Sequence, residues 1–156
     1  MGDSWARYYF LVLPSTFVYA SIFGILFSAS AFIDPIHRAC PEWRTTVVQE
    51  ALAANLASFC VTATIHGAYS WFTRSSRLVL SMGVLLSSLG LAGATLAVHF
   101  HQEWLFYVAF GVVGGAGGAL VDMSAVEHIL VWTSDSRKGF AGGFFAGGFL
   151  CGATFC

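Results

Sequence analysis

One acidic side chain in this sequence lies where it could carry a proton or an ion across a membrane. Asp122 falls inside a long apolar run that begins at Trp104. At about 1.5 Å of helix rise per residue it would lie ~27 Å along that run, still inside a hydrocarbon core of about 30 Å. Intramembrane acids mark ion or proton pathways. We therefore predict a pathway role for Asp122, with an interfacial acid paired to a basic loop residue as the alternative.

Two further side chains could serve the same substrate or proton pathway. His66 lies toward the end of an earlier apolar run, and an imidazole exchanges protons near neutral pH. Tyr19 lies in the first apolar run and offers a hydroxyl to a small polar substrate. An interfacial histidine and a helix-packing tyrosine are the structural alternatives. Asn55, in the same run as His66, is expected to form an interhelical hydrogen bond.

The other chemistry-bearing residues do not form a catalytic or metal site. His99, His101 and Glu103 alternate in one short segment, a pattern more typical of a polar loop than of metal ligands. The four cysteines show no paired spacing, and no nucleophile–base set or phosphate-binding loop is present. We therefore predict that the protein is not an enzyme and has no cofactor and no metal.

Composition indicates which elements must position these residues. The chain of 156 residues is 57% hydrophobic and 10% charged, with a mean hydropathy of +0.74. Soluble domains carry about 25% charged residues, so this chain has too little charge to cover a surface in water. A net charge of −1 argues against a nucleic-acid partner. The predicted class is an all-α polytopic protein whose partner is the lipid bilayer.

Five apolar runs are long enough to cross a bilayer, which takes about 20 residues. We predict a single transmembrane domain, 1–156, with five helices at residues 8–33, 47–71, 78–98, 104–126 and 139–156. The segment from Asp34 to Arg44 carries two prolines and four charges, so we expect a solvated connection there. All five tryptophans lie near run ends, where indoles favour the headgroup boundary.

The basic residues predict the orientation. With the N-terminus in the cytoplasm, the outer side holds only Arg38 and Arg44, and the inner side holds the other five basic residues: Arg7, Arg74, Arg77, Arg137 and Lys138. This bias predicts an integral multi-pass protein with a cytoplasmic N-terminus. The fifth run ends at Cys156 without a polar flank, so we expect a fragment of a longer chain; a naturally short five-span protein is the alternative.

Glycines spaced four residues apart mark the last two runs. They form the pairs Gly111/Gly115 and Gly114/Gly118, and the ladder Gly139, Gly143 and Gly147. Each would cost a helix in water about 1 kcal/mol relative to alanine. In lipid, small residues at this spacing let helix backbones approach closely. We therefore predict that these glycines pack helices together.

The junction between these two runs resembles the major facilitator superfamily. Its oxalate/formate antiporter-like and monocarboxylate transporter-like branches come closest. The matching positions are Arg137, Gly139, Ala141, Gly143, Ala146 and Gly147. The turn after the second run resembles the family's cytoplasmic loop motif at Arg74 and Arg77, while Thr73 stands at its acidic position.

The resemblance implies a secondary active transporter that works by alternating access. The chain would then supply part of the N-terminal half of a twelve-helix fold. It implies a small-molecule substrate, namely a small organic anion such as a monocarboxylate, with a proton as the candidate coupling ion. Arg74, Arg77, Arg137 and Lys138 would form the cytoplasmic loop motif. The alternative is a small non-transporting assembly or regulatory subunit that binds a partner through its glycine-rich helix faces.

Overall fold

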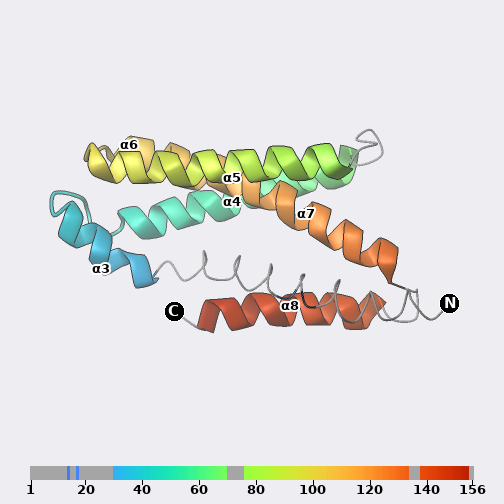
Figure 1. Cartoon of the computed structure of the whole chain (residues 1–156). Coiled ribbons are helices and arrows are strands. Elements are labelled where there is room, and N and C mark those ends of the chain that lie inside the picture. Colours follow the sequence, from blue (N-terminus) through green and yellow to red (C-terminus); the bar gives the residue numbers. More distant parts are fainter. Residues whose placement is uncertain (1–13, 15–16, 18–29, 70–75, 134–137, 155–156) are drawn as a thin grey trace. The chain divides into compact units, whose positions relative to one another are not determined.

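The computed structural model describes residues 14, 17, 30–69, 76–133 and 138–154, and this part of the chain is all-α (Figure 1). Its elements are α3 (Ser30–Ala39), α4 (Val47–Tyr69), α5 (Ser76–His99), α6 (Glu103–Phe106), η2 (Tyr107–Gly114), α7 (Gly115–Trp132) and α8 (Lys138–Thr154). Residues 29–124 form one compact unit, and residues 125–156 belong with 1–28 to another. Each unit is described separately below.

Three helices in the described part are long and apolar enough to cross a membrane. They cover Val47–Tyr69, Arg77–His99 and Glu103–Val131. The all-α, multi-pass prediction is therefore confirmed. Most of the predicted span 8–33 lies outside the described residues, and α8 covers the predicted span 139–156 up to Thr154.

The fourth helical run is longer than predicted. It was expected to end at residue 126, but α7 continues to Trp132. Glu127 and His128 lie inside α7, because both residue types are compatible with helical backbone and the apolar residues that follow extend the pattern. The last residue of the helix is Trp132.

The predicted connection from Asp34 to Arg44 is wrong in its first half, because α3 continues to Ala39 with Pro35 inside it. Proline and charge indicate loops, but α3 is amphipathic. Ile33 and Ile36 are partly buried on one side, and Asp34 is exposed. A short helix with one apolar stripe can lie along the end of a bundle while its charges stay in water.

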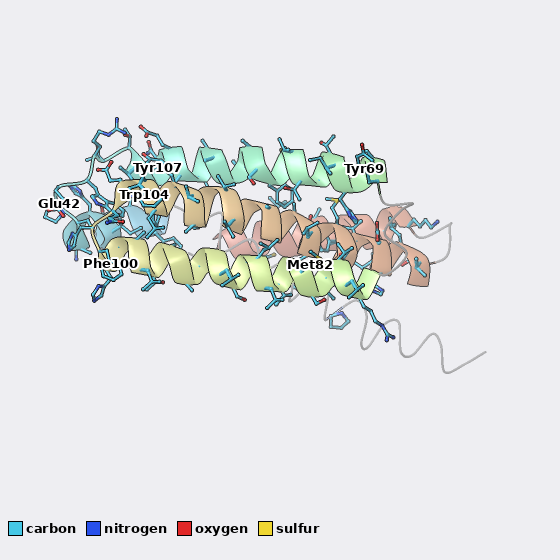
Figure 2. All side chains as sticks on the ribbon, turned by 90° about the horizontal axis from the view of Figure 1, so that it is seen from above. Glu42, Tyr69, Met82, Phe100, Trp104 and Tyr107 are labelled. Atoms are coloured by element: carbon cyan, nitrogen blue, oxygen red, sulfur yellow. The ribbon has the colours of Figure 1, made fainter. Side chains whose placement is uncertain are left out.

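A small hydrophobic core joins α3 to the three long helices at one end of the 29–124 unit. It contains Cys40, Trp43, Val47, Ala51, Ala94, Ala97 and Phe106. The ring centroids of Trp43 and Phe106 lie 5.5 Å apart, and the Cys40 Sγ donates to the carbonyl of Val98 at 3.5 Å. Figure 2 shows Glu42, Phe100 and Trp104 at this end of the helices and Tyr69 at the other.

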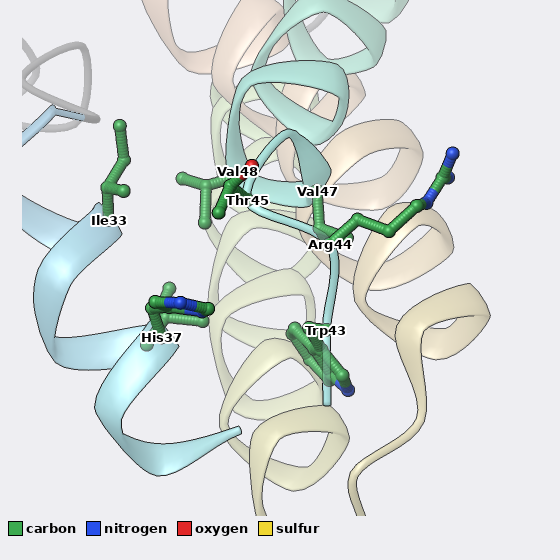
Figure 3. Close-up of a pocket in the computed structure, with 8 residues that line it drawn as sticks. Ile33, His37, Trp43, Arg44, Thr45, Val47 and Val48 are labelled. Atoms are coloured by element: carbon green, nitrogen blue, oxygen red, sulfur yellow. The ribbon is translucent and has the colours of Figure 1, made fainter. Parts of the chain in front are cut away.

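A shallow pocket lies beside this core, between α3 and the start of α4 (Figure 3). Its lining residues are Ile33, Ile36, His37, Trp43, Arg44, Thr45, Val47 and Val48. The Trp43 indole nitrogen is buried without a hydrogen-bond partner, and it points away from Ile33 and His37. Besides Trp43, the lining residues with polar side chains are His37, Arg44 and Thr45.

Large apolar side chains are exposed along α5. Leu78, Leu85 and Leu89 lie on one helical face with exposed fractions of 65%, 63% and 64%. An exposed apolar stripe of this length would be unfavourable in water and is the expected surface of a helix that faces lipid tails. The structure thus supports contact with a bilayer by its surface as well as by helix length.

Cys40 provides a test of the core. Burial and the nearby charge of Glu42 raise the pKa of the Cys40 thiol above its usual value. Because the thiolate is the reactive form, less of it is present at a given pH. In a chain whose only cysteine is Cys40, we expect slow labelling by a water-soluble maleimide near neutral pH, and faster labelling as the pH is raised. The readout is intact-protein mass spectrometry.

The control for this labelling is a Thr45→Cys variant without Cys40, because Thr45 is exposed and close in sequence. We expect Thr45→Cys to react at the rate of a free thiol. Equal rates for the two thiols in the folded protein would contradict the burial of Cys40.

Candidate functional site

The fourth helical run, α6–η2–α7, lies between α4 and α5. Both α4 and α5 pack directly against η2, and Figure 2 shows the run between them. Any polar group on this run that faces either neighbour is therefore removed from lipid. The candidate site is built from the residues on its α4 side.

The contact with α5 is made largely without side chains. A Cβ added at Gly90 would lie 2.7 Å from the backbone nitrogen of Gly114, and one added at Gly93 would lie 2.7 Å from the Ala109 Cβ. Real Cβ atoms do not approach other atoms so closely. The glycines of α5 thus allow its backbone to touch the fourth run, as expected for small residues between membrane helices.

The contact with α4 places the predicted glycines of the fourth run at the interface. A Cβ at Gly111 would lie 3.0 Å from the Ala54 Cβ, and one at Gly115 would collide with the backbone oxygen of Asn55. A Cβ at Gly114 would lie 3.4 Å from the Asn55 Nδ2, and Gly118 is buried. These glycines let the two helices meet at backbone distance.

The glycines of α8 behave differently. A Cβ added at Gly139, Gly143 or Gly147 would meet nothing within 4 Å, so the close packing predicted for them is not made in the described structure. This helix instead makes contacts between phenylalanine rings. Phe144 lies 5.1 Å from Phe17 and 6.1 Å from Phe140 between ring centroids.

The segment η2 is a π-helix, in which each backbone N–H bonds five residues back. Side chains of α4 bond its carbonyl groups: Asn55 Nδ2 donates to Phe110 O at 2.7 Å, and Ser58 Oγ donates to Val112 O at 2.8 Å. The interhelical hydrogen bond predicted for Asn55 is therefore confirmed. The π-helix itself was not predicted, because an apolar, glycine-containing run carries no signal that distinguishes it from an α-helix.

Asp122 is buried, with 8% of its surface exposed, and its Oδ1 has no hydrogen-bond partner among the described residues. It lies seven residues after Gly115 in α7, which is about two turns, so both residues share one helical face. Gly115 contacts Asn55, so this face is directed toward α4. A buried carboxyl oxygen without a partner is unfavourable by several kcal/mol in an apolar setting. Asp122 is the least satisfied polar group on this face.

His66 is also buried, with 9% of its surface exposed. It lies eleven residues after Asn55, about three turns, and so shares the face of α4 that meets the fourth run. Gly111 meets Ala54 and Gly115 meets Asn55, so the two helices run in the same direction. By helix rise, Asp122 lies about level with Thr62, and His66 lies about one turn further. By helical register, two predicted pathway residues thus fall on the sides of α4 and of the fourth run that meet at Asn55 and Gly115.

The other predicted residues that the structure describes are not brought to this site. Tyr19, Arg74 and Arg137 lie outside the described residues, and Arg77 is exposed at the start of α5. Lys138 is exposed at the start of α8, in the other unit. Among the described residues, no group of three or more His, Cys, Asp or Glu side chains could hold a metal.

A second polar cluster lies at the other end of the same helix pair. The Glu50 carboxylate accepts hydrogen bonds from Tyr107 at 2.6 Å and Thr46 at 2.8 Å, and it pairs with Arg44 at 3.3 Å. Tyr107 is the first residue of η2. This cluster was not predicted from the sequence, because nothing in the sequence pairs Glu50 with a tyrosine 57 residues away.

Comparison with known protein families, with curated proteins and with solved structures finds no match for this chain. A functional conclusion therefore depends on the chemistry of the chain itself. That chemistry consists of a buried acid and a buried histidine on facing helices of a multi-pass bundle.

Proposed function

We propose that the protein is a secondary active transporter of the major facilitator type, with Asp122 as the group that responds to a coupling proton. The observation that carries the proposal is the buried Asp122 Oδ1 without a hydrogen-bond partner. An acid in this position is unfavourable for stability, so a structural role accounts for it poorly. Reversible protonation gives it a role, because the neutral acid is far better tolerated among apolar helices than the carboxylate.

His66 fits the same pathway. An imidazole can give and accept a proton near neutral pH, and this one lies about one turn from the level of Asp122 on the facing helix. The substrate class in this proposal is a small organic anion such as a monocarboxylate, and its support is the resemblance at residues 137–147.

Uptake into vesicles tests this proposal. The full-length protein would be reconstituted into proteoliposomes and supplied with a labelled monocarboxylate under an imposed inward proton gradient. We expect uptake that rises with the gradient and collapses when a protonophore is added. Absence of flux for every small carboxylate, with the protein folded and inserted, would overturn the substrate class.

A second candidate function is a non-transporting assembly or regulatory subunit. The open positions Gly139, Gly143 and Gly147 favour it, since a helix face without side chains can accept a partner helix. In this case a photoreactive residue at Gly143 would crosslink to one defined membrane protein in cells. The vesicles would then show no gradient-dependent flux.

A further inference from the structure

We propose that η2 is the moving joint of the fourth membrane span and that Asn55 is the positioning residue that holds it in the π form. This inference rests on the proposed transport function and adds a mechanism that links the outer part of the span to Asp122. The support comes from the hydrogen bonds to η2 and from helical register.

The first argument is the pattern of hydrogen bonds. A π-helix is rare and in most proteins is limited to a single turn, frequently at a functional site, whereas η2 covers Tyr107–Gly114. In a membrane no water is at hand to bond a backbone carbonyl that a wider turn leaves under-satisfied. Asn55 supplies this bond to the carbonyl of Phe110 from a neighbouring helix, and Ser58 donates to the carbonyl of Val112, which also accepts from the backbone N–H of Gly115. Both side-chain donors come from α4, so the π form gains hydrogen bonds from that helix.

The second argument is that the start of η2 is anchored to α4. The Tyr107 hydroxyl donates to the Glu50 carboxylate at 2.6 Å. The start of η2 is thus fixed, and a change of helical form would move the part of the span that follows it.

The third argument concerns the size of that movement. Returning one π turn to α form shortens each hydrogen-bonded ring by one residue, which shifts the register of the following helix by one position. One residue of an α-helix corresponds to a rotation of about 100°. Such a step would turn Asp122 away from the face that meets α4. The joint would therefore give Asp122 two environments, which is what alternating access of a proton site requires.

The test measures rotation of α7 without measuring transport. Ser124 is fully buried in this structure, with 0% of its surface exposed. In a full-length chain whose only cysteine is Ser124→Cys, we expect slow labelling by a membrane-permeant maleimide. Adding Asn55→Ala removes one hydrogen bond from the π form, so we expect labelling to become about fivefold faster. Asn55→Gln keeps an amide donor and should restore slow labelling.

Two controls separate rotation from general loosening. Thr64→Ala removes a hydrogen bond that α4 makes only to its own backbone, at Cys60 O, and should leave labelling of Ser124→Cys unchanged. A chain with Cys40 as its only cysteine reports opening of the core, and Asn55→Ala should leave that labelling slow. Faster labelling of Cys40 as well would overturn the proposal, because the effect would then be unfolding. If Asn55→Ala does not fold, Ser58→Ala takes its place in the same comparison.

The labelling and the uptake assay fail independently. If labelling is faster in Asn55→Ala but no solute flux is found, the proposal that η2 is a joint is supported and the transport function is overturned. If flux depends on Asp122 but labelling is unchanged in both Asn55→Ala and Ser58→Ala, the transport function is supported. The proposal that η2 is a joint is then overturned.

Discussion

Replacing Gly115 with alanine is expected to destabilise the folded bundle by about 1–3 kcal/mol, the usual cost of forcing extra volume into a packed contact. The new Cβ would collide with the backbone oxygen of Asn55, and backbone cannot move aside as a flexible side chain can. The helices would have to separate, and the Asn55–Phe110 hydrogen bond of 2.7 Å would lengthen. Unfolding in mixed micelles with increasing SDS, followed by tryptophan fluorescence, measures the change in free energy.

Gly143→Ala is the matched control, because a Cβ at Gly143 meets nothing within 4 Å. Since alanine is the better helix former, we expect this substitution to be neutral or to stabilise by up to about 1 kcal/mol. A similar loss of stability in both variants would show that the contact between Gly115 and Asn55 is not what limits packing.

Asp122→Asn is expected to reduce proton-driven uptake at least tenfold, on the order expected when a positioned proton-transfer group is lost. The amide cannot exchange a proton, but it keeps the size of the side chain, so the folded yield should not fall. Glu103→Gln is the control, because this acid lies at the first residue of α6, at the opposite end of the same helical run. Proteoliposome uptake of the three proteins, normalised to inserted protein, is the measurement.

Asp122→Leu separates function from stability at the same position. Because Asp122 Oδ1 is buried without a partner, replacing the acid with an apolar side chain should stabilise the protein by about 1–3 kcal/mol while uptake is lost. A loss of both stability and uptake would mean that Asp122 has a structural partner and is no free proton site.

The sequence was most informative where one physical requirement dominates. A bilayer crossing needs about 20 apolar residues, so α4 and α5 were predicted to within two residues of their bounds. Asn55 was predicted to bond a neighbouring helix, since an amide in lipid has no other partner. Which carbonyl it reaches could not be predicted, because that depends on the register between two helices far apart in the chain.

Other features gave no usable signal. The residues of α3 have the proline and charge content of a loop, and only the apolar stripe of Ile33 and Ile36 distinguishes them from one. The π segment η2 accepts hydrogen bonds from Asn55 and Ser58 of α4, and the residues of η2 alone do not indicate these partners. The two glycine-rich runs look alike in sequence, yet a Cβ added at Gly115 would collide with Asn55, and one added at Gly143 would meet nothing within 4 Å. Spacing indicates that a helix face can pack, and the neighbour decides whether it does.

The position of the fourth run between α4 and α5 has a consequence for biosynthesis. The ribosome makes α4 and α5 before the fourth run, and N-terminal parts of a chain generally begin to fold first. The faces of both helices that carry Ala54, Asn55 and Gly90 find their partner only when the later helix arrives. Until then Asn55 has no Phe110 carbonyl to bond, and its amide must be satisfied at the membrane surface or by the insertion machinery. The interval between insertion of α5 and of the fourth run is therefore when this bundle is most exposed to quality control.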